Sequence, residues 1–241
     1  MGFVHGKNSR LLLADSLFSG FLRDFEHGDE IEMADSTTFG VEGHTFVPGL
    51  ESGTLSINGL MDDDATVGGQ NERLTSALRS ADGSVITSAP AGLAVGEQVH
   101  MIEARETNYA VSTPVADLVS FSASWQAEGQ VDKGRVLRAH GAVSATEDGT
   151  GVDNTALSSD GAAAHLHVTA NTRDGSTTVK VQHSVDNSVF VDLISFAAVA
   201  AGDTTSERLT VTGTVNRYLR AQTTLAGTTG SITLAVAAAR R

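Results

Sequence analysis

LVSFSASWQA occupies residues 118–127 and has the clearest strand pattern of the chain. Its apolar side chains alternate strictly with small polar ones, Val119, Phe121, Ala123 and Trp125 against Ser120, Ser122, Ser124 and Gln126. A period of two residues is the signature of a β-strand with two unlike faces. GTLSINGL, residues 53–60, repeats the pattern, with Leu55 and Ile57 on one face and Thr54, Ser56 and Asn58 on the other. These two stretches together predict a sheet with one buried apolar face and one face of small polar side chains.

Further strands are predicted along the whole chain. The first 140 residues offer 10–14, 25–34 and 97–113, and the last is long enough that we expect a bulge or a bent hairpin arm in it. Six more strands, separated by turn residues such as RDG, DN and AGTTG, are predicted at 163–171, 176–184, 189–196, 207–214, 217–225 and 231–239. Strands at such spacing predict an antiparallel β-sandwich.

One α-helix is predicted, over residues 70–81. Leu74 and Leu78 lie four residues apart and form an apolar stripe. Asn71 is the expected N-cap, with Glu72 at the positive end of the helix, and Gly83 is the expected stop.

The composition changes near residue 140, where residues 139–164 are small, polar and acidic. We therefore predict two domains, 1–140 and 141–241. The first carries nine Lys and Arg against twenty Asp and Glu, a formal charge of −11, and the second carries seven against nine, a charge of −2. Acidity concentrated in one domain indicates a local role for the charge.

Composition excludes several classes of protein. There is no cysteine, so disulfides and thiolate chemistry are absent, and a net charge of −13 argues against tight binding of nucleic acid. No stretch approaches the 18–20 or so apolar residues of a membrane span. The N-terminal LLLADSLFSGFL is interrupted by Asp15 and is interpreted as a strand and turn, so we expect no signal peptide and no membrane anchor.

Catalytic patterns are missing as well. The chain has no G-x-S-x-G elbow, no phosphate-binding P-loop and no H-E-x-x-H motif, and we expect no enzyme, no cofactor and no metal. His165, His167 and His183 could form a metal site, but ordinary polar sheet positions are the favoured interpretation. The acidic run at 62–64 lacks the alternating spacing of a calcium loop, and a solvated loop is favoured there.

An acidic strand face is the next candidate. Glu26, Glu30 and Glu32 share one face of the strand 25–34. They form either an ordinary exposed face or a wall of a wet channel, together with Ser120, Ser122 and Ser124. A sheet with one apolar and one small polar face can curve around such a channel.

Residues 36–50 are expected to form a long loop that anchors onto a neighbouring subunit. It combines glycines with apolar residues that would be awkward on a free loop, and the candidate contacts are Phe39, Gly40, Gly43, Phe46, Val47 and Pro48. Such a loop can also cover an exposed strand edge of its neighbour.

DSTTFG (35–40), HTFVPGLESGTLSINGLMD (44–62) and the run 90–134 together resemble the major tail protein of long-tailed bacteriophages, the tail tube subunit. The resemblance covers most of residues 1–140. VQHSVDNSVFVDL (181–193) and TVNRYLRAQTTLAG (214–227) are similar to β-sandwich modules that often follow such domains.

The resemblance implies a mainly β fold: a tail-tube-type two-sheet barrel or sandwich with one flanking helix, followed by a C-terminal antiparallel β-sandwich that decorates the outside. It implies self-assembly into stacked rings, hexameric in that family, that form the tail tube and conduct the genome. The implied partners are further copies of the chain, tape measure, tail terminator and tip proteins, and phage DNA that passes without tight binding. The implied location is the virion tail, assembled in the bacterial cytoplasm.

Two alternatives stay open at this point. A capsid-surface decoration protein would share the β-rich composition. A carbohydrate-binding β-sandwich module would use exposed aromatic residues, yet the chain has one Trp and two Tyr, and Trp125 falls on an apolar face.

Overall fold

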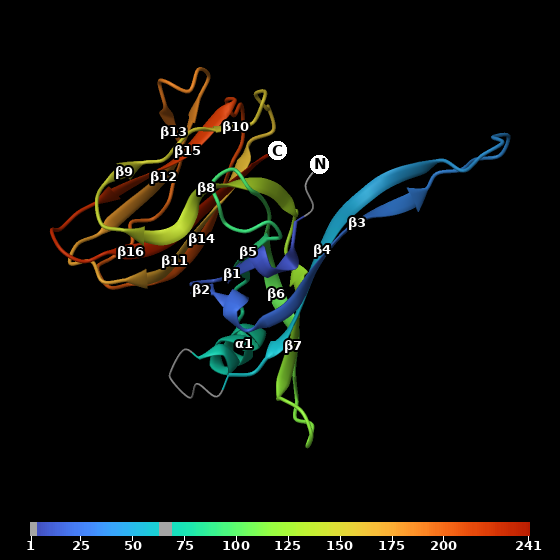
Figure 1. Ribbon diagram of the computed structural model, residues 1–241. Coiled ribbons are helices and arrows are strands. Elements are labelled where there is room, and N and C mark those ends of the chain that lie inside the picture. The colour runs from blue at the N-terminus through green and yellow to red at the C-terminus, as the bar shows by residue number, and fades with distance from the viewer. Residues whose placement is uncertain (1–3, 63–68) are drawn as a thin grey trace. The chain divides into compact units, whose positions relative to one another are not determined.

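The computed structural model describes residues 4–62 and 69–241, and these are mainly antiparallel strands with one α-helix (Figure 1). Contacts group the chain into two compact units, here called unit 1 and unit 2. Unit 1 holds Met1–Gly20, Val85–Met101 and Asp132–Arg241, and unit 2 holds Phe21–Ser84 and Ile102–Val131. The predicted fold class, mainly β with one helix and a C-terminal antiparallel sandwich, is confirmed.

Most of the strands belong to unit 1. Near the N-terminus come the short 3-10 turns η1 (Gly6–Asn8) and η2 (Phe18–Gly20) with β1 (Arg10–Leu13) and β2 (Ser16–Leu17). β5 (Ser84–Ala89) pairs with β1, and the start of β6 (Gln98–Ser112) pairs with β8. The remaining strands of unit 1 are β8 (Asp132–Val143), β9 (Glu147–Asp148), β10 (Val152–Asp153), β11 (Ala162–Asn171), β12 (Thr177–Ser184), β13 (Val191–Ser195), β14 (Thr205–Val211), β15 (Tyr218–Leu225) and β16 (Ile232–Arg240).

These later strands form the predicted sandwich. One layer runs in the order β14-β11-β16-β8, and the other runs β10-β15-β12-β13 with β9 paired to β15. Between them lies one apolar core, to which Leu166 and Val168 of β11, Val179 and Val181 of β12 and Leu234 of β16 contribute. The strands β5 and β8 were not predicted from the sequence.

β11 and β16 are buried on both faces. One face of β16 packs in the sandwich core, and Ala237 and Ala239 on its other face join a second cluster with Val99 and Val136. Small apolar residues therefore follow one another without alternation in AAAHLHV and LAVAAA. Strands covered on both sides have this near-continuous apolar pattern.

His165 and His167 of β11 are fully buried in unit 1, and burial lowers the pKa of both, that of His167 to about 4. The two rings are therefore neutral, and their hydrogen bonds fix the tautomers. The carbonyl of Ala14 can only accept, so Nδ1 of His167 donates to it over 2.7 Å, and Nε2 accepts from the Thr87 hydroxyl over 2.8 Å. Thr87 Oγ1 in turn accepts from Nδ1 of His165 over 2.9 Å.

The hydrogen-bonded chain continues into a buried ion cluster. Nη1 of Arg208 donates to Nε2 of His165 over 2.7 Å, and the same guanidinium contacts the buried carboxylate of Asp132. Nε of Arg241 donates to the other oxygen of Asp132 over 2.8 Å. Each buried polar group of this chain has a partner, which is what allows it to lie inside the unit.

We predict that unit 1 loses stability as the pH falls from about 6.5 to 4. Unfolded histidines bind protons in that range and the buried pair does not, so the free energy of unfolding drops by up to about 1.4 kcal/mol per pH unit for each histidine. Urea denaturation at a series of pH values measures this slope. His167→Gln should flatten it, whereas the exposed control His5→Gln should not; equal slopes in both variants would contradict the assignment.

Unit 2 is built on a four-stranded antiparallel sheet. Its strands are β3 (Leu22–Asp35), β4 (Phe46–Leu60), β7 (Ser120–Ala127) and the second part of β6, in the order β3-β4-β7-β6. The register of β6 against β7 shifts between Glu106 and Asn108, so the predicted bulge in the long strand is confirmed. β3 and β4 continue past β7 as a two-stranded arm (Figure 1).

The predicted helix is present as α1 (Gln70–Arg79) and begins at the predicted residue, but its predicted N-cap and its predicted C-terminal end are wrong. Gly69 occupies the N-cap without a side-chain hydrogen bond, and the helix stops at Ser80, before Gly83. Asn71 lies inside the first turn instead, where its Oδ1 accepts from the Tyr109 hydroxyl over 2.6 Å. A tertiary hydrogen bond thus uses the side chain that the sequence pattern assigned to capping.

The net negative charge of the chain lies entirely in unit 2, and unit 1 is neutral. Unit 2 holds four Lys and Arg against seventeen Asp and Glu, a net −13, and unit 1 holds twelve of each. The predicted boundary at residue 140 falls within β8, and unit 1 includes N-terminal segments of the chain. The division of roles between 1–140 and 141–241 stays a prediction.

Among the described residues, no helix combines the length and the apolar character that crossing a membrane requires.

Candidate functional site

The candidate site is the polar face of the sheet in unit 2. Directly paired residues of an antiparallel sheet point to the same side. Ser56 of β4 lies opposite Glu26 of β3 and opposite Ser124 of β7, and Ser124 is itself paired with Asn108 of β6. Four strands therefore contribute one unbroken polar row, which brings together the predicted residues Glu26 and Ser124.

The next row repeats the arrangement. Asn58 lies between Asp24 and Ser122, and its Nδ2 donates to Oδ1 of Asp24 over 2.9 Å. Ser120 lies one step farther, paired with Leu60 and Ser112. The three predicted serines therefore share the face of Glu26; their side chains are half-buried, whereas Glu26 is exposed.

Glu30 and Glu32 lie farther out. Glu30 is paired with Ser52, and β4 pairs with β7 only from Thr54 onward, so both glutamates belong to the two-stranded arm. Glu32 lies opposite a bulge, because Ile31 pairs with Glu51 and Met33 with Pro48. The structure brings these two residues to the polar side of β3 but not into the rows of serines.

The opposite face of the sheet in unit 2 is apolar and buried, and is here called the closed face. Leu55, Ile57, Phe121 and Trp125 are buried there. Tyr109, which shares that side through its pairing with Ala123, is hydrogen-bonded to α1. Only the polar face of this sheet is therefore open within unit 2, as its alternating sequence predicted.

Glu106 is an acidic residue on the closed face, paired with Trp125. It is 7% exposed, and no described residue donates a hydrogen bond to either of its carboxyl oxygens. Burial raises its pKa to about 8, so it is mainly protonated at neutral pH. The sequence offered no sign of it, since the bulge beside it breaks the alternation of β6.

We predict that Glu106 makes unit 2 less stable as the pH rises from about 4.5 to 8. The folded carboxyl keeps a proton that the unfolded one has lost, so stability is highest below pH 4.5 and falls toward pH 8. Glu106→Gln keeps the shape without the ionisation and should remove this decline in urea denaturation. Glu42→Gln, an exposed change in the same unit, should leave the decline intact; a decline that survives in Glu106→Gln would refute the prediction.

The arm carries the second group of predicted residues. Residues 46–50, expected in a loop, are part of β4, so the prediction of a loop over 36–50 is wrong for its last five residues. Pro48 and the glycines suggested a loop, but Pro is tolerated on an edge, and this part of β4 pairs only with β3. The connection itself is 36–45, with Gly40 in the left-handed region at φ 94° and Gly43 beside it.

The tip is held by local hydrogen bonds. The amide of Ser36 donates to the Thr45 carbonyl over 2.8 Å, and Oδ1 of Asp35 accepts from the Thr37 amide over 2.8 Å. The His44 ring stacks on Phe46 with 6.1 Å between centroids. The tip is therefore a defined turn at the end of a hairpin.

Large apolar side chains cover this arm without burial. Phe39 is fully exposed and Leu50 is 80% exposed, and at least half of the surface of Ile31, Met33, Phe46 and Val47 is open. Ile31, Met33 and Leu50 were missed in the sequence, although Ile31 and Met33 alternate with the glutamates of the same strand. Exposed apolar residues gathered on one element indicate a surface that another molecule covers.

The three histidines considered as metal ligands do not form a site, and the favoured interpretation as half-exposed sheet positions is wrong for His165 and His167, which are buried. His165 and His167 use their ring nitrogens in the buried chain, and His183 accepts from the Asn216 amide over 3.2 Å. No group of three or more candidate ligands occurs in 4–62 and 69–241. Asp63 and Asp64 of the acidic run lie outside the described residues.

Comparison with known proteins finds similarity at the level of structure only. No protein-family model matches the chain, and no curated protein does.

The solved structures that the chain is similar to include tail tube and tail hub proteins. One is from the virion of a native gene transfer agent particle, at 14% identity over 54% of this chain and 98% of the other, with a TM-score of 0.45. Another is the SPP1 tail tube, at 11% identity over 54% and 78%, with a TM-score of 0.44. The Dit protein of phage SPP1, a hub of the adsorption apparatus, matches at 13% identity over 96% and 98%, with a TM-score of 0.42.

Proposed function

We propose that this chain is a non-enzymatic structural protein of a phage tail, the tube subunit, which assembles with copies of itself into stacked rings. The observation that carries the proposal is the sheet of unit 2. It has one closed apolar face, one open face of small polar and acidic residues, and an arm whose large apolar residues are uncovered. The sequence resemblance in residues 1–140 points the same way.

The arm supplies the contact between subunits. Each large apolar side chain that becomes buried contributes roughly 1.5–3 kcal/mol, so a few of them suffice to hold neighbouring copies together once repeated around a ring. Phe39, Phe46 and Val47 are the proposed anchors, Gly40 and Gly43 shape the turn that presents them, and Pro48 stiffens the strand behind it. Six subunits per ring is the number we propose, following the family that the sequence resembles.

The polar face supplies the channel wall. DNA carries one negative charge per about 1.7 Å of its axis, and a basic wall would hold it by many phosphate contacts. A wall of Glu26, Glu30, Glu32, Ser120, Ser122 and Ser124 keeps the duplex in a hydrated gap. The net −13 of unit 2 supports this role, because it is concentrated in the unit that owns the face.

Other parts of the proposal concern location and partners. The protein resides in the virion tail after assembly in the bacterial cytoplasm, where it meets tape measure, tail terminator and tip proteins. Residues 141–241 decorate the outside of the tube. A carbohydrate-binding role is less well supported, since Trp125 is 1% exposed and so offers no open aromatic platform.

Replacing three arm residues tests assembly. Phe39→Ser, Phe46→Ser and Val47→Ser together should leave the subunit folded, because these side chains make no core contacts in one copy, and should abolish long tubes in negative-stain microscopy. The matched control is Val185→Ser with Val189→Ser, two exposed apolar residues of unit 1, which should assemble normally. Tubes of normal length from the arm variant would sink the proposal.

Charge reversal tests the channel wall. Replacing Glu26, Glu30 and Glu32 by Lys changes each subunit by six charge units and should permit assembly while slowing DNA ejection from virions. The slowing should be greatest at low salt, since the Debye length at about 0.15 M is only about 8 Å. The triple Gln variant separates loss of negative charge from gain of positive charge. Ejection at the wild-type rate in the Lys variant at low ionic strength would show that the DNA does not meet this face.

A further inference from the structure

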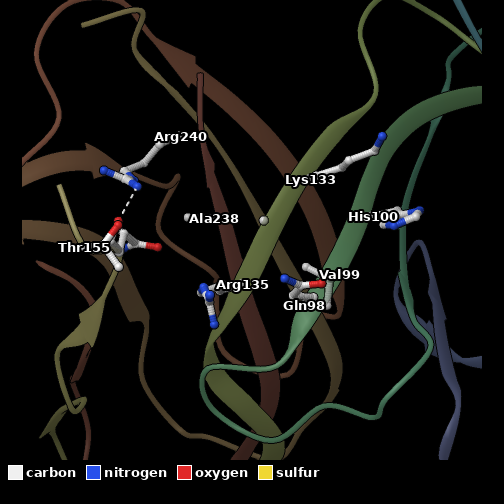
Figure 2. A pocket seen from close by; sticks show the side chains of 10 residues that line it. Gln98, Val99, His100, Lys133, Arg135, Thr155, Ala238 and Arg240 are labelled. Carbon is white, nitrogen blue, oxygen red and sulfur yellow. Dashed lines mark hydrogen bonds between the residues drawn. The ribbon is translucent and has the colours of Figure 1, made fainter. Parts of the chain in front are cut away.

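A cavity of about 310 Å³ lies in unit 1, where β6, β8 and β16 run beside the segment that follows β10. Figure 2 shows Arg135 of β8 and Arg240 of β16 at this cavity, with Thr155 next to Arg240 and Gln98 of β6 on the other side. The described residues that line it include no Asp or Glu. Lys133 also lines it, so the cavity carries three cationic side chains in a unit whose net charge is zero.

The positive charges of Arg135 and Arg240 repel each other. The pKa of Arg240 is lowered, first by burial and then by the positive charge of Arg135. Nη2 of Arg240 donates to the Asn154 carbonyl over 2.7 Å, and Nη1 of Arg135 donates to the Gly96 carbonyl over 2.8 Å. Backbone carbonyls hold both guanidinium groups in place without neutralising either charge.

The carboxylate of Asp153, next to the cavity lining, forms an ion pair with Arg217. Asp153 precedes the lining segment, and its two oxygens accept from Nε and Nη2 of Arg217 over 2.7 and 2.6 Å. This bidentate pair holds the pKa of Asp153 at about 2, so its charge is matched by a third arginine. Arg135 and Arg240 therefore have no hydrogen-bonded carboxylate among the described residues, and Asp153 acts on both of them as a nearby charge.

The backbone at the rim is strained. Thr155 has φ 69°, in the left-handed region, which is a genuine outlier for a β-branched residue. The hydrogen bond from its amide to Asp153 Oδ1, 2.7 Å long, holds it there. Strain of this kind persists where the surrounding structure demands a particular shape, and it clusters at ligand sites.

We propose that this cavity is an oxyanion site, in which a carboxylate or phosphate group bridges Arg135 and Arg240. A planar guanidinium presents N–H groups in a fork that matches the spacing of two oxyanion oxygens, and two of them facing one anion relieve their mutual repulsion. The amide of Gln98 lies within the same lining and adds a neutral donor. The anion is either a soluble one or an acidic side chain of a second copy of the chain.

The test is a titration of the full-length protein with sodium phosphate and with glutarate, at constant ionic strength set by sodium chloride. Both anions should raise the melting temperature in a saturable way, and calorimetry should give a matching affinity. Arg135→Gln should weaken binding by about tenfold, the loss expected for one charge-assisted hydrogen bond. The control Lys180→Gln removes a positive charge from β12, where Lys180 forms an ion pair with Asp192 of β13, and should bind as the wild type does.

Stabilisation no greater than that by chloride, or equal phosphate affinity in wild type and Arg135→Gln, would overturn the site. If Arg135→Gln does not fold, Arg135→Lys keeps the charge without the fork and should still bind more weakly. Sedimentation in phosphate identifies the source of the anion. Dissociation of assembled protein indicates that a neighbour's carboxylate is displaced, and unchanged assembly indicates a soluble anion.

Discussion

The register of β4 is the constraint on which unit 2 depends. β4 pairs with β3 along nearly its whole length and with β7 from Thr54 to Leu60, so a single strand aligns both neighbours. Because side chains alternate with a period of two, a shift by one residue would exchange the buried and open faces. Burial of Leu55 and Ile57 under the closed face therefore also determines where Glu26 and Ser124 point.

The same strand explains the arm. Before Thr54, β4 pairs with β3 but not with β7, and this two-stranded extension has no core of its own to bury Phe46 or Leu50. An isolated two-stranded ribbon is marginally stable in water, so a partner that covers the apolar residues also stabilises the ribbon. Exposed apolar residues and an incomplete sheet are thus two aspects of one feature.

Unit 1 differs from unit 2 because two of its strands are buried on both faces. Alanines of β11 and β16 fit where the space between layers is small, and hydrogen bonds of the His165–Thr87–His167 chain satisfy the polar groups that are enclosed. The twelve positive charges of unit 1 equal its twelve negative charges in number, and several of them meet in ion pairs, such as Arg217 with Asp153.

The class of the fold, most of its strands, the helix and the two faces of the sheet around Ser120–Gln126 could all be predicted from the sequence, because alternation and helical spacing are local properties of the chain. The tertiary structure alone decided what depends on distant partners. Strand pairing extended β3 and β4 into an arm, and a hydrogen bond from the Tyr109 hydroxyl engaged the side chain of Asn71. The tertiary structure also buried Glu106 beside a bulge and joined N-terminal segments to the sandwich. Pairing register, burial and shared hydrogen bonds bring together residues far apart in the chain, and no local pattern records which residues those will be.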